Sequence, residues 1–454
     1  MKKILFVSTI LLLVSAVNYA QVKKPIAKPA AKPVVKQFPK VHIGIQSIGS
    51  PEVSLKLVAR IQSYNPFANT PGDVYDKSIN SPKSVLVLEK IVNNMAVKKL
   101  YVNNLEGGTT TVYDIVNNFE KIAEIKHMFT QKDTGLFKET NFPGYAFKYH
   151  KRGPNVFTGK PVEMCLSNNN KYLWIPYYRR DYDKLATEPS AIAIVNVDSD
   201  KIVRVMPTAP LPKMVACSAD NKFIAVTNWG DNTVHLIDIS SGDPAQFQYV
   251  AHFVVDQKMN LNFSKTAVID RDQDCGLCLR GTVFTPDNNY LFVGRMGGGG
   301  IAVFDTKGKK YLGTLYGTNN NVRHLVINGD YLFLSSNKDG YVEKTKWKDM
   351  LNFFLTGQGQ KAVPYTNWQT AFSGLGARTI TVTTDGAYLF ANANLESKIS
   401  IVRTKDMAVI GSIDADPYPV GMVMDQSNNY LIVTAQGRQD KGGNSVMIYQ
   451  VMRQ

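Results

Sequence analysis

Residue types that build most catalytic and metal sites are scarce in this sequence. Its 454 residues include six histidines and four cysteines. The histidines are scattered, and no Ser-His-Asp order, HExxH zinc motif or Walker phosphate loop occurs. We therefore predict no cofactor and favour a protein that is not an enzyme.

Acidic residues are absent from the first 40 positions, which hold eight lysines. Met1 to Ala20 combines Lys2-Lys3 with an apolar core, Ile4 to Val17, and ends on a small residue, as a secretory signal peptide does. The core is too short and wrongly flanked for a membrane span. We expect cleavage near Ala20, a periplasmic or extracellular mature protein, and no transmembrane segment in it.

Residues 21–40 are rich in lysine, proline and alanine. Proline prevents helix and sheet and the like charges repel one another, so this stretch is expected to be an extended linker. It serves as a spacer, or as a cationic tether for an anionic wall polymer or lipid headgroups. Residues 41–454 are predicted to form one domain.

The four cysteines fall into two pairs. Cys275 and Cys278 are close in sequence, and export to an oxidising compartment favours a disulfide that pins the local loop; a metal or redox pair and free thiols are the alternatives. No histidine follows Cys278, which excludes a c-type haem site. Cys165 and Cys217 sit one register apart on equivalent strands, so we expect free, buried thiols that point to opposite faces.

What the sequence does contain is a repeated pattern of short strands. Its clearest copy, Lys213 to Ile239, has β-forming runs at Met214–Cys217, Phe223–Thr227 and Thr233–Ile239, separated by turns rich in Asx, Gly and Ser. A fourth strand, about Phe247 to Val254, completes a four-stranded antiparallel meander.

Seven such units occur along the chain. The other copies are Lys98–Ile115, Val162–Tyr178 with a third strand at Ser190–Val197, Arg280–Thr306, Arg323–Thr345, Arg378–Thr404 and Val420–Val451. They predict an all-β, seven-bladed β-propeller of four-stranded antiparallel blades. The last copy has three strands, so the lone strand Val53–Ile61 is expected to supply the fourth and close the ring, although a strand in a local cap is the alternative.

The repeat resembles that of YVTN-type seven-bladed propellers, in which a strand precedes a Gly-rich turn and a V-x-V-I-D-like strand. Tyr101-Val102-Asn103-Asn104 precedes Gly107-Gly108, and Ala225-Val226-Thr227-Asn228 precedes Val234-His235-Leu236-Ile237-Asp238. The resemblance covers about residues 84–454 and implies the propeller fold and a binding role of unspecified target. Seven-bladed propellers that look related include sugar lactonases and lyases, which act at the funnel mouth.

One column of the aligned repeats lies just before the first strand of each blade, which lines the central channel. Its members, the first copy being too divergent to align, are Val162, Lys213, Arg280, Arg323, Arg378 and Val420. Four cations at one height favour a funnel that binds carboxylates or phosphates. Alternatively, each cation pairs with an acid of a neighbouring blade. His324 lies beside the column and is the candidate proton donor or acceptor if the protein is an enzyme.

Three aspartates, Asp270, Asp272 and Asp274, alternate as at the start of a Ca²⁺ loop. The pattern then departs from that loop, because Cys275 and Gly281 stand where it requires Gly and Glu. We therefore predict no metal site. If the protein does bind a metal ion, these three aspartates are the candidate ligands, and the ion is Ca²⁺.

Three segments are longer than a meander needs: Met128–Gly159, Gln257–Leu277 and Lys348–Gly376. Placed between the last strand of one blade and the first of the next, they are expected to form a rim on one face. The aromatic residues of this rim are Phe129, Phe137, Phe142, Tyr145, Phe147, Tyr149, Phe353, Phe354, Tyr365, Trp368 and Phe372. They form a binding face, or they pack the loops down.

These patterns together predict a secreted, monomeric, non-catalytic scaffold or binding module. Its funnel and aromatic rim would hold an anionic small molecule or glycan, or an envelope protein, and no specific nucleic acid. The alternative is a lactonase- or lyase-like enzyme in which Arg280, Arg323 and Arg378 hold an acidic sugar at the funnel mouth.

Overall fold

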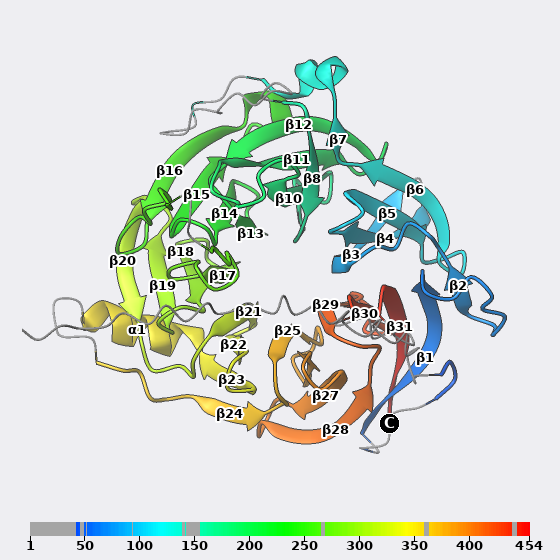
Figure 1. The fold of residues 1–454 in the computed structure, drawn as a ribbon. Coiled ribbons are helices and arrows are strands. Elements are labelled where there is room, and N and C mark those ends of the chain that lie inside the picture. The colour runs from blue at the N-terminus through cyan, green and yellow to red at the C-terminus, as the bar shows by residue number, and fades with distance from the viewer. Residues whose placement is uncertain are drawn as a thin grey trace, which may run out of the picture. The chain divides into compact units, whose positions relative to one another are not determined.

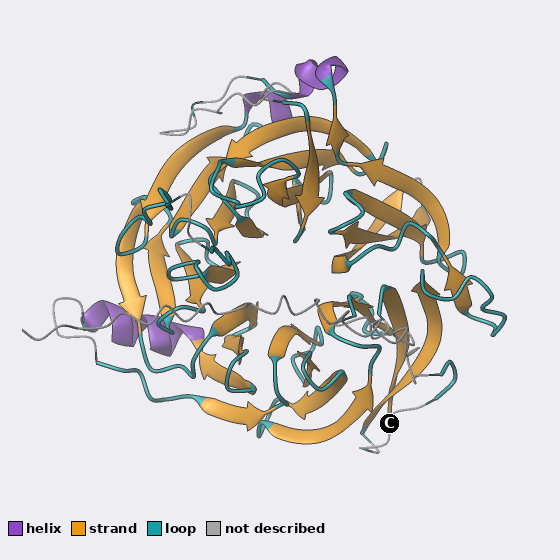
Figure 2. Ribbon diagram, viewed as in Figure 1, coloured by secondary structure: helices purple, strands orange, loops and turns teal. Residues whose placement is uncertain are grey.

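The computed structural model describes residues 42–45, 50, 52–92, 94–138, 141, 155–264, 268–357, 363–437 and 443–454. The predicted signal peptide and linker lie outside the described residues. Strands dominate the described chain, and helices are few and short (Figure 2). No helix among the described residues has the length and apolar character needed to cross a membrane.

The described strands form seven sheets around a central axis (Figure 1). From the second sheet to the last, the innermost strands contact one another in succession, and that of the last sheet contacts that of the first. The first and second sheets contact each other through the strand at residues 157–161, so the ring is closed. The prediction of a seven-bladed propeller with four-stranded antiparallel blades is confirmed.

Each blade has an innermost strand at the channel and extends outward from it. From the inside outward, blade 1 is β3 (Pro82–Val92), β4 (Met95–Asn104), β5 (Thr109–Asp114) and β6 (Glu120–Lys126). Blade 2 is β9 (Cys165–Ser167), β10 (Tyr172–Arg180), β11 (Ser190–Asn196) and β12 (Lys201–Thr208); β8 (Phe157–Pro161) also pairs with β10, and β7 (Met128–Phe129) pairs with β8. Blade 3 is β13 (Pro212–Cys217), β14 (Phe223–Asn228), β15 (Thr233–Asp238) and β16 (Gln248–Val254), and blade 4 is β17 (Leu279–Phe284), β18 (Tyr290–Arg295), β19 (Ile301–Asp305) and β20 (Lys310–Leu315).

The remaining elements complete the ring. Blade 5 is β21 (Val322–Asn328), β22 (Tyr331–Ser336), β23 (Tyr341–Lys346) and β24 (Gln369–Phe372); blade 6 is β25 (Ala377–Val382), β26 (Tyr388–Ala393), β27 (Lys398–Arg403) and β28 (Ala408–Asp414); blade 7 is β29 (Pro419–Met424), β30 (Tyr430–Ala435), β31 (Ser445–Arg453) and β1 (Val53–Gln62), with β2 (Asp73–Tyr75) at its outer edge; and the helices are α1 (Trp347–Thr356), η1 (Gln131–Leu136) and η2 (Pro244–Gln246).

The middle strands of each blade are buried on both faces because neighbouring blades pack against them. In β14 and β15 nearly every residue is buried, so their apolar runs are continuous rather than alternating. One core cluster joins Trp174 and Ile194 of blade 2 to Val226, Ile237 and Phe247 of blade 3. The hydrophobic core is therefore a series of clusters between blades.

The N-terminal strand closes the ring, as predicted. β1 pairs antiparallel with β31 and becomes the fourth strand of the last blade. A buried ion network reinforces this seam: Arg60 contacts Asp416 at 3.3 Å and Asp73 at 2.7 Å, and the Ser445 hydroxyl donates to Asp416 at 2.6 Å. β31 therefore does not present a free strand edge, because β1 pairs along it.

The predicted placement of the three long segments is wrong for one of them. Residues 348–376 contain most of α1 and all of β24, which is the outer strand of blade 5 itself. Residues 128–159 lie between β6 and β9, as predicted, and contain β7 and the start of β8, which extend the sheet of blade 2. Residues 257–277 join β16 to β17, also as predicted.

The two remaining cysteines are free, as expected, and both are partly buried. Cys165 of blade 2 and Cys217 of blade 3 pack against the same cluster between the two blades. They therefore point to opposite faces of equivalent strands, as the difference in register predicts, and face each other across the gap. Burial and the nearby Cys217 thiol raise the pKa of Cys165 well above its usual value.

Candidate functional site

A β-bulge stands near the start of six of the seven inner strands. The register of the inner strand slips between Pro82 and Ser84, and between Pro212 and Met214. Equivalent slips occur in β17, β21, β25 and β29. Each slip contains the second residue of its strand, and a bulge frees that residue from the ladder and re-aims its side chain. The six residues so placed are Lys83, Lys213, Arg280, Arg323, Arg378 and Val420.

Hydroxyl groups hold the backbone at several of these positions. Thr434 donates to the carbonyl of Lys83 at 3.5 Å, Ser335 to that of Arg378 at 2.5 Å, and Thr379 to that of Val420 at 2.6 Å. In all three cases the hydroxyl comes from the preceding blade. The packing of the blades therefore fixes the bulges, and through them the height of the cations.

Lys83 is the member of this ring that the sequence alignment missed. It occupies the same bulge in β3 as Lys213 does in β13. The signal available was the proline that precedes the column residue at Pro161-Val162, Pro212-Lys213 and Pro419-Val420, and again at Pro82-Lys83. The structure thus places a fifth cation at the mouth, in blade 1.

Two of the five cations have carboxylate partners. Lys213 Nζ lies 3.6 Å from Asp272 Oδ1, and Arg280 pairs across the channel with Glu163 of blade 2. The predicted alternative, pairing with an acid of a neighbouring blade, therefore describes Lys213, whose partner lies in the segment between blades 3 and 4, but not Arg280, whose partner is two blades away.

The other three cations form no ion pair among the described residues: Lys83, Arg323 and Arg378. Arg323 has a buried Nε without a hydrogen-bond partner, and one of its Nη atoms approaches Met296 Sδ at 3.5 Å. The guanidinium of Arg378 lies 5.8 Å from the ring centroid of Tyr418. Arg378 is buried, and Lys83 and Arg323 are partly exposed toward the channel mouth. Charges removed from bulk water are normally paired, so these three groups need an explanation.

Mutual repulsion adds to the cost of burying these groups. Burial, followed by Arg378, Lys213, Arg280 and Arg323, lowers the pKa of Lys83 well below its usual value. Burial, followed by Arg378 and Arg280, lowers the pKa of Arg323 in the same way. The mouth therefore holds cations in close proximity without enough carboxylates to neutralise them.

Lys83, Lys213, Arg323 and Arg378 line a cavity of about 1090 Å³ at the mouth of the channel, whereas Arg280, which was predicted to join them, is not part of its wall. This volume lies slightly above the usual range for small-molecule sites. Glu106, Asp270 and Asp272 are the acidic residues of the lining, and the basic ones are Lys83, Arg179, Lys184, Lys213, Arg271, Arg323, Lys338 and Arg378. The cavity is thus strongly positive, and a concave site of one sign attracts ions of the opposite sign.

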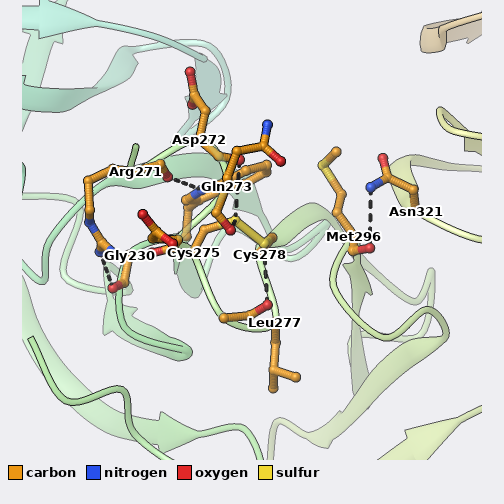
Figure 3. Close-up of a disulfide and its surroundings, with 12 residues drawn as sticks. Gly230, Arg271, Asp272, Gln273, Cys275, Leu277, Cys278, Met296 and Asn321 are labelled. Carbon is orange, nitrogen blue, oxygen red and sulfur yellow. Dashed lines mark hydrogen bonds between the residues drawn. A yellow bond between two sulfur atoms is a disulfide. The ribbon is translucent and has the colours of Figure 1, made fainter. Parts of the chain in front are cut away.

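The loop that carries Asp272 is held by hydrogen bonds and by the predicted disulfide (Figure 3). Arg271 donates to the carbonyl of Gly230 at 2.5 Å, and the indole N–H of Trp229 donates to the carbonyl of Arg271 at 3.2 Å. Cys275 and Cys278 are joined, which confirms the disulfide. A Cβ at Gly297 would lie 2.2 Å from the Gly276 carbonyl, so the loop packs directly on the next blade.

His324 does not belong to the described cavity wall. Burial, helped by Arg280 and Arg323, lowers its pKa to about 4. It lies beside Gly281 of blade 4, where a Cβ would come within 3.0 Å of the His324 backbone. This histidine is therefore neutral at pH 7 and packed between two inner strands.

The Ca²⁺ candidate is not formed. The described residues contain no cluster of three or more His, Cys, Asp or Glu side chains that could hold a metal ion. Asp272 turns toward Lys213, and Asp274 accepts a hydrogen bond from the backbone of Asp270 at 2.9 Å. The aspartates serve the loop and the cation instead.

The described aromatic residues of the predicted rim do not line the cavity either. Phe129 and Phe137 belong to a core cluster of blades 1 and 2, and Phe354, Tyr365 and Trp368 pack around α1. Phe353 and Phe372 are exposed, at 38% and 50%, but neither lines the cavity. The remaining aromatics of the predicted rim, Phe142, Tyr145, Phe147 and Tyr149, lie outside the described residues.

Comparison with known proteins finds one matching family and similar solved structures. A family model described as "Lactonase, 7-bladed beta-propeller" matches residues 159–452, whereas no curated protein matches. Among solved structures, the chain is similar to the β-propeller domain of Cps50 (Swd1) from Myceliophteria thermophila, with a TM-score of 0.52, 11% identity, and coverage of 81% of this chain and 100% of that one. It is also similar to hydrazine synthase of Kuenenia stuttgartiensis, with a TM-score of 0.48, 18% identity, and coverage of 68% and 81%. The first of these likenesses supports the propeller fold alone, and the narrower YVTN-type relationship stays a prediction.

Proposed function

The chain belongs to the lactonase seven-bladed β-propeller family, and we propose that its funnel binds a small organic anion. The observation that carries this proposal is the set of three cations without carboxylate partners, Lys83, Arg323 and Arg378, around one cavity. An anionic ligand supplies the charges that the described residues do not.

The geometry suits a carboxylate or phosphate ligand. Arginine forks bind such groups in a bidentate manner, and Arg323 keeps a buried Nε without a hydrogen-bond partner. The cavity is large enough for a sugar acid or a polycarboxylate. A protein partner would need an acidic segment that enters this mouth, and it is the second occupant that a binding screen should include.

Calorimetric titration of the full-length chain with inorganic phosphate, citrate and gluconate tests the proposal, at low and at physiological salt. Each charge-assisted hydrogen bond contributes about 1.5–3 kcal/mol, so the triple variant K83M/R323M/R378M should lose at least ~100-fold in affinity. Lys222→Met is the matched control, since Lys222 pairs with Asp220 and is 61% exposed. Equal binding by the triple variant would show that the ring is structural.

Lactone hydrolysis is a second candidate function, and the family match favours it. The Asp272 carboxylate is 67% exposed and accepts a hydrogen bond from the Tyr178 hydroxyl at 3.3 Å. It could take a proton from a water that attacks the lactone carbonyl while the cations stabilise the oxyanion. The ring C–O bond then breaks, and the alkoxide recovers the proton to give a hydroxy acid.

We rank binding before hydrolysis because the Asp272 carboxylate is a weak base. The Lys213 ammonium is the main cause that holds the pKa of Asp272 below its usual range, and such a carboxylate is a weak base. Proton release from sugar-acid lactones, followed in a pH-stat, tests this candidate. Asp272→Asn should abolish turnover and leave gluconate binding within a few-fold of the parent.

A further inference from the structure

Lys213 is the cation of the mouth whose surroundings differ from those of the other four. Its side chain is 7% exposed yet forms part of the cavity wall. Nζ lies 3.9 Å from the ring centroid of Tyr178 and 4.8 Å from that of Trp229. Asp272 Oδ1 is 3.6 Å away. A lysine that is packed by aromatic rings and still reaches the cavity has few alternative positions for its amine.

The charges around Lys213 favour its neutral form. Burial is the largest cause, Asp272 opposes it, and Arg280, Arg323 and Arg378 act with burial, so that the pKa of Lys213 falls to about 7. A desolvated lysine next to other cations is the arrangement in which an amine becomes nucleophilic near neutral pH.

The same cavity holds the groups that would fix the other end of a reacting acid. Arg323 and Arg378 line it without carboxylate partners among the described residues, as does Lys83. A short acid bound by these cations would keep its remaining atoms within the same small space as Lys213. The juxtaposition of an anion site with a buried amine suits a substrate that carries both a carboxylate and a carbonyl.

We propose that Lys213 forms an imine with the carbonyl group of an oxo acid whose carboxylate is held by the unpaired cations of the mouth. This inference rests on the anion binding proposed above and names the chemical class of ligand. The amine nitrogen attacks the carbonyl carbon, which gives a cationic nitrogen and an alkoxide. A cationic nitrogen is far more acidic than water, so Asp272 accepts one proton from it, although it is a weak base, and passes this proton to the alkoxide to form the carbinolamine hydroxyl. Asp272 carries the second proton of the nitrogen to that hydroxyl, which leaves as water as the C=N bond forms, so no oxidant or reductant is needed.

Borohydride trapping of the full-length chain with pyruvate tests this step. Hydride from sodium borohydride reduces the C=N bond to a stable secondary amine, which peptide mass mapping then locates. We expect one adduct, on the peptide that contains Lys213, at neutral to mildly alkaline pH. An exposed lysine such as Lys222 should react at least ~10-fold less, because it is neither buried nor surrounded by other cations.

Lys213→Arg is the matched variant, since it keeps a cation in the ring and removes the nucleophilic amine. It should give no adduct with pyruvate, whereas the control variant Lys222→Met should still be labelled at Lys213 as the parent is. Mapping on the unaltered chain needs no variant and decides the question even if Lys213→Arg folds poorly. Absence of an adduct at Lys213, or equal labelling of exposed lysines, would overturn the imine.

Failure of the imine is distinguishable from failure of anion binding. Lactate that binds to the parent chain and is lost in K83M/R323M/R378M, with no adduct from pyruvate, leaves the anion site intact and removes the imine. An adduct at Lys213 that the triple variant loses supports both. If lactate and citrate both fail to bind, the anion proposal fails, and any adduct is then reactivity of Lys213 by itself.

Discussion

The two ends of the propeller's inner strands treat polar residues in opposite ways. At the N-terminal ends, Lys83, Arg323 and Arg378 converge without carboxylate partners among the described residues. At the C-terminal ends, the turns that lead to the second strands repeat an aspartate, at Asp220, Asp287, Asp385 and Asp425.

The aspartates of these turns are satisfied within their own turns. Asp385 accepts from the Thr383 hydroxyl at 2.5 Å and from the backbone N–H of Ala387 at 3.0 Å. Burial alone would raise its pKa, but these hydrogen bonds and Arg453 outweigh that effect and hold it at about 2. Asp220 and Asp287 also accept a hydroxyl and a backbone N–H each.

The comparison separates repeated residues that build the fold from repeated residues that are available to a ligand. A repeat in one register shows only that the blades place equivalent residues at equivalent heights. Whether the polar groups are satisfied internally decides between a structural and a binding role. The aspartates of the turns are satisfied internally and therefore have a structural role, whereas the cations of the mouth are not.

Removing a turn aspartate should have the largest effect on stability. Asp425 is 2% exposed and accepts from the backbone N–H groups of Asn429 at 2.7 Å and Tyr430 at 2.8 Å, and from the Ser427 hydroxyl at 2.5 Å. Asp425→Ala leaves these donors unpaired, so the free energy of unfolding should fall by about 2–3 kcal/mol in urea denaturation.

Asp425→Asn is the control for this prediction, because its amide oxygen can still accept from the two backbone donors. It should retain at least about half of the lost stability. Anion affinity at the mouth should be unchanged in both variants. A stability loss confined to the mouth variants would reverse the comparison.

Removing a mouth cation should have a smaller effect on stability, and of opposite sign. Arg378 is 5% exposed and is repelled by Arg280. Arg378→Met keeps most of the packing and relieves that repulsion, so the free energy of unfolding should rise by about 1 kcal/mol in a buffer without phosphate or carboxylate. The same variant should bind citrate at least ~10-fold more weakly. A loss of stability would indicate that Arg378 supports the fold.

The smallest effect expected is a dependence of anion affinity on pH. The pKa of Lys213 is about 7, so this side chain is charged below pH 7 and neutral above it. Affinity for citrate should therefore fall between pH 6 and pH 8, by on the order of three-fold for one charge at about 10 Å in a wet site. Titrations at constant ionic strength measure this change, and it should disappear in Lys213→Met.

Other groups face Lys213 and should not produce this step. Asp272 remains ionised, because its pKa is lowered, and Tyr178 remains neutral, because burial is the main cause that raises its pKa. The turn aspartates Asp220, Asp287 and Asp385 lie at the opposite ends of the inner strands, and their pKa values are also lowered. An equal step in Lys213→Met would assign it to a group outside this set.

Local pattern was sufficient for the strands, the blades and the way the ring closes. Runs of β-forming residues between Asx- and Gly-rich turns are read within about ten residues of one another, which is why the seven meanders could be predicted. The closing strand followed from the three strands counted in the last copy, since an unpaired edge is unfavourable. The Cys275–Cys278 disulfide was predictable because its partners are neighbours in sequence.

Tertiary structure alone decided which cations are paired and where they stand. Arg280 and Glu163 are 117 residues apart, and no local pattern joins them. The bulges that aim the cations depend on hydroxyl groups from preceding blades, and these same contacts reveal Lys83. The pairing of a buried charge depends on every group that surrounds it in space. The repeats in the sequence therefore determined at which positions the basic residues stand, and the packing of the blades determined which of these residues are available to a ligand.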